Sequence, residues 1–468
     1  MNWKEVVGNA AVAFMAQSVA MLLSVVQTLI VPKFLGVTQF GYWQLFVFYA
    51  SYVKLFSLGL NDGVYLINGG KTWATINRSL ISSQFAFGLL YESIIAFGLG
   101  LFAFMANLEF GRRLVIFCVA IFLIIQNACL YITGVLQAVN ETKKSSMFTI
   151  VERIAYLAFL GALFLGGVRN FVPYVLLNLL SNAIGLAYCL CEFKGVLRSG
   201  LANVRETARA AISSIRVGIK LTIANLASTL IVGLSRFAID AAWGIEVFGK
   251  VSLSLSLTTF FLAFVNQASM VLFPALRQSG EREIDGFFIF SRDFMGIFFP
   301  CMYLLYFPIV AMLSLWLPDY QDSLQFFMYL IPICVYDSKV NISCFTYLKV
   351  KRLEARMLTV NLLTTTFSAI GTAIAISVFD SVYGVFISMV SAIVIRSYYL
   401  DWFVSKRTGA PKSLVGLSEF LVTAAFILSG LLLSSVCAAL VTLAFCCMHL
   451  LVCRERAAEM LDLLRRRI

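Results

Sequence analysis

The chain has 468 residues, of which 60% are hydrophobic and only 13% charged, and its mean hydropathy is +0.90. A soluble domain carries about 25% charged residues, so this composition excludes a soluble globular protein. Lys and Arg outnumber Asp and Glu by 36 to 24, a net charge of +12, but in so apolar a chain this excess does not by itself indicate a nucleic-acid partner.

About fourteen apolar stretches are each long enough to cross a bilayer as a helix, which takes roughly 20 residues. They extend over 8–31, 42–60, 80–105, 114–139, 147–167, 171–191, 218–239, 250–273, 294–317, 323–348, 357–379, 381–400, 415–433 and 434–453. Strands of a membrane barrel would instead alternate apolar and polar residues over about ten positions. The sequence therefore predicts an all-α polytopic membrane protein with about 14 transmembrane helices.

The positions of Lys and Arg predict the orientation of these helices. With the N-terminus inside, the inner connections hold roughly five times as many basic residues as the outer ones, which is the bias that orients membrane helices. We therefore expect both termini to be cytoplasmic. The connection 192–217 and the tail 454–468 are basic and amphipathic. Each is predicted to lie at the membrane surface beside anionic lipid, with docking of a partner as the alternative.

A short motif occurs twice at matching places in the chain. Gly-(Val/Ile)-x-x-Phe-Gly is found at 36–41 and again at 244–249, each time directly after the first helix of a six-helix set. This predicts a parallel duplication with pseudo-two-fold symmetry. The predicted division is an N-terminal lobe at 1–191, the linker at 192–217, a C-terminal lobe at 218–402, two additional helices at 403–453, and the basic tail at 454–468.

The N-terminal region resembles a known transporter family. Asn2-Trp3-Lys4 leads into a helix that ends near Pro32, Phe34-Leu35-Gly36 and Gln39-Phe40-Gly41-Tyr42 follow, and the second helix closes in Ser57-Leu58-Gly59-Leu60-Asn61-Asp62-Gly63. These residues and the six-plus-six-plus-two topology are similar to the polysaccharide-transporter (Wzx-like flippase) branch of the multidrug/oligosaccharidyl-lipid/polysaccharide (MOP) exporter superfamily. The resemblance implies a MATE/MOP-like fold. It also implies a flippase that moves an undecaprenyl-diphosphate-linked oligosaccharide across the bacterial inner membrane by alternating access.

Ionisable residues inside the predicted spans are the candidates for the site, because such residues usually face a bundle interior or a water-filled cavity. We expect Lys54, Arg153, Arg236 and Lys339 to line a cationic cavity that binds the lipid-linked diphosphate through charge-assisted hydrogen bonds. Glu92 and Asp337 are expected to act as counter-charges or as coupling groups for H⁺ or Na⁺.

Structural roles are the alternatives at these positions. Arg153 can pair with its neighbour Glu152, and Arg396 lies near an inner helix end, where its side chain is expected to snorkel toward the interface. Asp337 and Lys339 are two residues apart on one helix, so they do not face each other and need partners elsewhere. Polar helix residues such as Asn127 and Asn182 either bind sugar hydroxyls or hydrogen-bond between helices.

No catalytic, metal or cofactor site is predicted. Gly69-Gly70-Lys71-Thr72 resembles the end of a phosphate-binding loop, but Tyr65 stands where that loop needs its first glycine. The predicted outer connections are about ten residues or fewer, too short to hold the acceptor of a glycan-assembling enzyme. A non-enzymatic flippase is therefore favoured over two alternatives, a cation-coupled multidrug antiporter of the same superfamily and, less favoured, a membrane enzyme of polysaccharide assembly.

Overall fold

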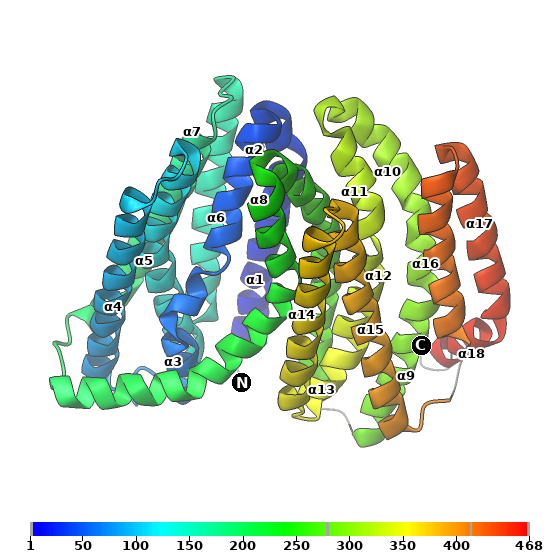
Figure 1. Cartoon of the computed structure of the whole chain (residues 1–468). Helices are drawn as coiled ribbons and strands as arrows, with labels where there is room; N and C mark the ends of the chain where they lie inside the picture. Colours follow the sequence, from blue (N-terminus) through cyan, green and yellow to red (C-terminus); the bar gives the residue numbers. More distant parts are fainter. Residues whose placement is uncertain (1–2, 278–279, 412–413, 466–468) are drawn as a thin grey trace. The chain divides into compact units, whose positions relative to one another are not determined.

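The fold is described from a computed structural model, which covers residues 3–277, 280–411 and 414–465 (Figure 1). These residues form helices joined by turns, with no strand among them, and they divide into two compact units, Met1–Leu226 and Ala227–Ile468. Eleven of the described helices are long and apolar enough to cross a membrane. The predicted all-α polytopic fold is confirmed. The count of about fourteen spans, the symmetry of the two halves and the five-part division stay predictions.

The first unit consists of α1 to α7 and the beginning of α8. Its elements are α1 (Trp3–Val25), a π-helical turn (Val26–Ile30), α2 (Val31–Ala50), a 3-10 turn (Val53–Ser57), α3 (Leu60–Asn68), α4 (Arg78–Met105), α5 (Phe110–Ala138), α6 (Thr142–Leu165) and α7 (Phe171–Leu197). α8 (Val204–Arg277) continues into the second unit. α5 is the central helix, since it packs against α2, α3, α4, α6 and α7. Asn2, the first residue of the N-terminal motif, lies outside the described residues.

The second unit contains the rest of α8 and ten further α-helices. They are α9 (Glu281–Phe298), α10 (Tyr303–Trp316), α11 (Gln321–Leu330), α12 (Pro332–Lys339), α13 (Thr346–Val350), α14 (Glu354–Ser377), α15 (Val382–Thr408), α16 (Val415–Leu432), α17 (Ser435–Val452) and α18 (Arg454–Arg465). A 3-10 turn (Phe299–Met302) joins α9 to α10, another (Pro318–Tyr320) precedes α11, and a π-helical turn (Val340–Phe345) joins α12 to α13. α15 packs against α9, α11, α12 and α14, while α16 and α17 form a pair that packs on α9 and α10.

Polar residues define several helix ends. The side chain of Asn77 accepts a hydrogen bond from the backbone N–H of Leu80 at the start of α4, and Asn170 does the same for Val172 at the start of α7. These caps satisfy backbone donors that the first turn leaves without a partner. At the other end of α15, Gly409 takes the left-handed conformation (φ 65°) that commonly ends a helix.

The repeated motif has the same local structure in both units. Gly36 (φ 68°, ψ 174°) interrupts α2 and Gly244 (φ 78°, ψ −173°) interrupts α8, in a backbone region that is essentially restricted to glycine. The motif phenylalanines that follow, Phe40 and Phe248, are both fully buried. Each glycine therefore allows a kink between two predicted spans that are otherwise continuous in helical hydrogen bonding.

Two predicted spans are not single continuous helices in the structure. The span predicted at 42–60 does not end at 60. α2 ends at Ala50, a 3-10 turn follows, and α3 continues the segment to Asn68. The span predicted at 323–348 is likewise divided into α11, α12, the π-helical turn and α13. Apolar composition marks a segment as buried, but it does not show where the backbone leaves the α-helical conformation.

The linker helix is continuous with the next predicted span. α8 begins at Val204 and contains no residue with non-helical dihedral angles before Gly244. Its first turns run across one end of α3 and α4 (Figure 1), and they contact these helices through small side chains such as Ala211 and Ser214. The apolar residues Leu201, Val204 and Ile212 are exposed. Part of the apolar face that is expected to meet the membrane is therefore exposed.

Candidate functional site

Lys54 lies in the break between α2 and α3. Its side chain is 38% exposed, and its Nζ is 2.8 Å from Oδ1 of Asp62 in α3. The other carboxylate oxygen of Asp62 accepts a hydrogen bond of 2.7 Å from the Thr222 hydroxyl in α8. Lys54 is near the middle of the segment between Gly36 and Asn68, which extends beyond the predicted span 42–60.

Asn127 supports the backbone at this break. Leu58 and Gly59 both have positive φ (50° and 87°), so the regular helix is interrupted here. The Asn127 side chain in α5 donates to the Val53 carbonyl at 3.1 Å, and the Asn61 side chain donates to the Asn127 carbonyl at 3.2 Å. Of the two predicted roles for Asn127, these contacts support hydrogen bonding between helices.

The break also contacts α8 with almost no space between the two backbones. A Cβ atom added at Gly63 would collide with the backbone of Ser214, and one at Gly218 would collide with the backbone of Gly59 and Gly63. Only glycine allows this approach. Together with the Asp62–Thr222 hydrogen bond, it fixes the beginning of α8 against the broken segment that carries Lys54.

Arg153 and Glu92 are the other predicted site residues of the first unit. Arg153 pairs with its neighbour Glu152 in α6, with Nε 3.0 Å from Oε2, and its side chain is 38% exposed while that of Glu152 is buried. This is the ion pair that was expected as the structural alternative. Glu92 is buried in α4 and forms no ion pair with any side chain that the structure describes.

Arg236 contacts the second copy of the repeated motif. It lies in α8 before the kink at Gly244, and its guanidinium carbon is 5.2 Å from the centre of the Phe248 ring. A terminal nitrogen donates a hydrogen bond of 2.8 Å to the Ser252 hydroxyl. The position one repeat earlier, 208 residues upstream, is Thr28. The cation is therefore a feature of the second unit and not of the repeat.

Asp337 and Lys339 have partners on different helices, as their spacing predicts. Lys339 is 2% exposed, and its Nζ is 3.0 Å from Glu419 in α16 and 3.1 Å from Asp401 in α15. Asp337 pairs with Arg396 in α15. The expectation that Arg396 snorkels is wrong, because its side chain is buried and also donates to the Asn361 side chain. A buried acid close to Arg396 keeps the guanidinium inside the bundle.

The partner acids were missed by the sequence analysis. Glu419 lies inside the predicted span 415–433, where a carboxylate is itself a strong signal. Asp401 directly follows the predicted span 381–400, and Asp62 follows 42–60, so both were placed in connections. A search that extended each span by one turn would have found them.

Charged side chains of both signs line a cavity in the second unit. The cavity has a volume of about 460 Å³ and is bordered by Lys339, Asp401 and the Arg292–Asp293 ion pair of α9, among others. Ser405 links the two groups, since it donates to Asp401 and accepts from Arg292 at 3.0 and 3.1 Å. Lys339 thus belongs to a polar network that joins α9, α12, α15 and α16.

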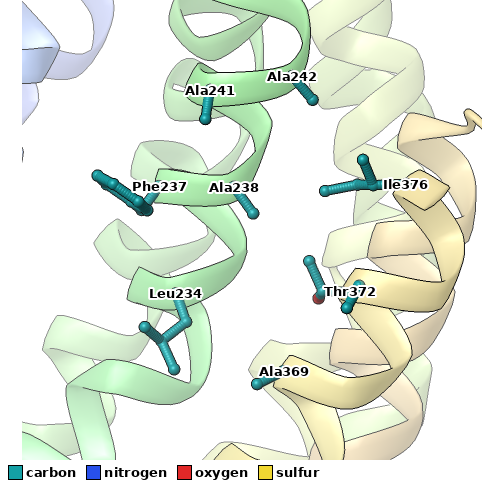
Figure 2. Close-up of a pocket in the computed structure, with 9 residues that line it drawn as sticks. Leu234, Phe237, Ala238, Ala241, Ala242, Ala369, Thr372 and Ile376 are labelled. Atoms are coloured by element: carbon teal, nitrogen blue, oxygen red, sulfur yellow. The ribbon is translucent and has the colours of Figure 1, made fainter.

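A larger pocket in the same unit is apolar. It has a volume of about 580 Å³ and lies between α8 and α14, where Figure 2 shows Leu234, Phe237 and Ala238 opposite Thr372 and Ile376. No charged residue lines it. Arg236, on the same helix, contacts Phe248 and Ser252 instead. This pocket therefore offers a phosphate no positively charged side chain among its lining residues.

Comparison with known proteins identifies the family. The model of the polysaccharide biosynthesis protein family matches residues 6–279, more than half of the chain. The chain belongs to this family. No curated protein matches its sequence.

Solved structures identify the fold of this family member. It is similar to the inward closed conformation of the lipid II flippase MurJ, with a TM-score of 0.62 and 11% identity over 96% of this chain and 100% of that one. An inward-facing multidrug resistance MATE family transporter also gives 0.62, at 12% identity over 85% and 98%. A MOP superfamily transporter from Pyrococcus furiosus gives 0.51, at 12% identity over 87% and 96%. The polysaccharide biosynthesis family member thus has the fold of MOP superfamily transporters.

The predicted cations of this family member are distributed over both units. Lys54 and Arg153 lie in the first unit, and Arg236 and Lys339 in the second. Within the first unit each cation has an acidic partner close in sequence, whereas Lys339 has two acids from other helices. A single cationic cavity lined by all four residues stays a prediction.

Proposed function

We propose that this protein is a flippase that moves an undecaprenyl-diphosphate-linked oligosaccharide across the bacterial inner membrane by alternating access, with both termini in the cytoplasm. The observation that carries the proposal is a set of basic residues within the predicted membrane spans of a chain of the polysaccharide biosynthesis family. Such residues are costly in a bilayer and usually serve a pathway. A lipid II flippase shares the fold, which supports transport of a lipid-linked substrate.

The basic residues would bind the diphosphate of the substrate. Lys54 and Arg153 are each 38% exposed, so a phosphate oxygen can approach them and compete with the carboxylates of Asp62 and Glu152. Arg236 offers a planar guanidinium that suits bidentate contact with phosphate. Exchange of one anionic partner for another would let the diphosphate bind without leaving a buried cation uncompensated.

Lys339 would act differently from the other three cations. It is 2% exposed and held by two carboxylates, so a phosphate that bound it would have to displace Asp401 or Glu419. We propose that Lys339 contributes to the cavity chiefly through this network. Glu92 and Asp337 remain the candidates for counter-charges or for groups that couple transport to H⁺ or Na⁺.

Transport of a lipid-linked oligosaccharide in proteoliposomes tests the proposal. Arg236→Ala is expected to lower the rate by at least tenfold, since a charge-assisted hydrogen bond contributes about 1.5–3 kcal/mol, and Arg236→Lys should retain part of it. Arg113→Ala is the matched control, because Arg113 is exposed at the start of α5. Wild-type rates for both Arg236→Ala and Lys54→Ala at equal expression would contradict a phosphate-binding role.

The same vesicles separate the alternative functions. Turnover of the lipid-linked sugar without covalent change supports a flippase. Cation-driven uptake of a drug, with no turnover of the lipid, would identify a multidrug antiporter. A new glycosidic product would identify an enzyme of polysaccharide assembly.

A further inference from the structure

Two arginines contact one aromatic ring where the start of α14 lies beside the end of α15. Arg356 lies in the first turn of α14 and Arg407 in the last turn of α15, and their guanidinium carbons are 4.6 and 5.2 Å from the centre of the Phe403 ring. Both side chains are exposed. Neither forms an ion pair with a side chain that the structure describes. Two cations on one ring, neither of them ion-paired among the described side chains, attract an anion.

An apolar groove begins beside these arginines and follows the same two helices. It has a volume of about 290 Å³, and its walls include Val360, Leu363 and Phe367 of α14 and Ile395 and Tyr399 of α15. Arg396, whose charge is paired with Asp337, also borders it. Arg356 precedes Val360 by four residues, and Phe403 and Arg407 follow Tyr399 at intervals of four. Residues at such intervals lie on one face of a helix. The arginines and the groove are therefore continuous.

The arginines and the groove together have the length of an acyl chain in one leaflet. From Arg356, which precedes the groove, to Phe367 in its wall, α14 rises about 16 Å at 1.5 Å per residue, and half of a bilayer's hydrocarbon core is about 15 Å. Leu363, Phe367 and Ile395 on the groove walls are 65%, 50% and 54% exposed, so an acyl chain can reach them.

The surroundings of the arginines match the headgroup level of a membrane. Trp402 is exposed, and the ammonium group of Lys406 lies 5.6 Å from the centre of its ring. Exposed Trp with adjacent basic residues is typical of the membrane–water interface. In the predicted orientation this end of α14 and α15 is cytoplasmic.

We propose that Arg356, Arg407 and the groove between α14 and α15 form a binding site for an anionic phospholipid of the inner leaflet. The two guanidinium groups bind the phosphate, and one acyl chain fills the groove. Basic pockets between membrane helices on the cytoplasmic side commonly bind such headgroups. This lipid is a resident partner and is separate from the transported substrate, so the site does not depend on the proposed function.

Lipid binding to the purified full-length protein tests the site. The probes are phosphatidylglycerol and phosphatidylcholine with the same acyl chains, titrated onto delipidated protein and followed by native mass spectrometry. Arg356→Ala/Arg407→Ala is expected to weaken phosphatidylglycerol binding about thirtyfold, from roughly five- to sixfold for each basic side chain at a membrane surface. Binding of phosphatidylcholine should change little.

A matched control removes the same charge elsewhere. Arg205→Ala/Arg209→Ala deletes two exposed arginines of α8 that line none of the three cavities described above, and it should weaken phosphatidylglycerol binding less than threefold. Equal losses in the two double variants would overturn the proposal, since they would show attraction by overall charge. Unchanged binding in Arg356→Ala/Arg407→Ala would overturn it as well.

A second pair of measurements tests the occupant of the groove. Phe367→Ala removes an exposed wall residue and should reduce the preference for long-chain over short-chain phosphatidylglycerol, with thermal unfolding checked to show that the variant is folded. Undecaprenyl phosphate is titrated in parallel. If Arg356→Ala/Arg407→Ala loses undecaprenyl phosphate and keeps phosphatidylglycerol, the site belongs to a polyprenyl lipid and the assignment is wrong.

Discussion

Replacing Lys339 by methionine distinguishes a structural cation from a substrate ligand. The change leaves two carboxylates next to each other without a positive charge: that of Glu419, which is fully buried, and that of Asp401, which is 19% exposed. Removing one partner of a buried ion pair costs about 3–5 kcal/mol, because the remaining charge is uncompensated. We expect Lys339→Met to destabilise the protein by about that amount.

A second substitution tests whether the loss of stability comes from the uncompensated carboxylate of Glu419. Glu419→Gln in the Lys339→Met background removes the buried carboxylate, so the double variant should recover at least about 2 kcal/mol relative to Lys339→Met. The free energies of unfolding are measured for the wild type, Lys339→Met, Glu419→Gln and the double variant. Each purified protein is unfolded with denaturant in detergent micelles, and unfolding is followed by circular dichroism. Lys250→Ala is the control: Lys250 has a single surface partner, Asp322, and its loss should cost about 1 kcal/mol or less.

One combination of results would refute this reasoning. If Lys339→Met were as stable as the wild type but inactive in transport, Lys339 would be a ligand of the substrate and not a member of the network. A double variant no more stable than Lys339→Met would also show that the buried carboxylate is not the source of the cost.

Further predictions concern glycines and the broken segment. Gly36→Ala and Gly244→Ala should each cost about 1–3 kcal/mol, although a Cβ atom meets nothing within 4 Å at either position. Gly161→Ala, in a regular helix with equal space, should be neutral or stabilising in thermal unfolding, and equal effects at all three would show that backbone conformation is not the cause. Asn127→Ala should destabilise by about 1–3 kcal/mol, since it leaves a buried carbonyl at the break without its donor; an unchanged midpoint of unfolding would contradict this role. Gly218→Ala should raise the protease sensitivity of the linker more than Gly161→Ala does, because no side chain fits against α3, and equal digestion rates would contradict the close contact.

The sequence predicted features that depend on composition and on local conformation. The apolar stretches predicted the all-α membrane fold, because a bilayer requires long apolar helices. The repeated Gly-(Val/Ile)-x-x-Phe-Gly has the same local structure at both its occurrences, because its first glycine takes a conformation that only glycine adopts easily. The spacing of Asp337 and Lys339 predicted separate partners, since residues two apart do not share a helix face.

The tertiary structure alone decided which groups meet. Lys339 is followed by its partners 62 and 80 residues later, and helical periodicity tells which face a residue occupies but not which helix lies opposite. The break at Val53–Ser57 was equally hidden, because its stability comes from Asn127 on another helix. The sequence determined that the chain belongs in a lipid bilayer, that it is helical, and which charged residues lie within its apolar stretches. Packing decided the partners of those charges, because the low dielectric of the interior makes each one depend on the neighbours it meets.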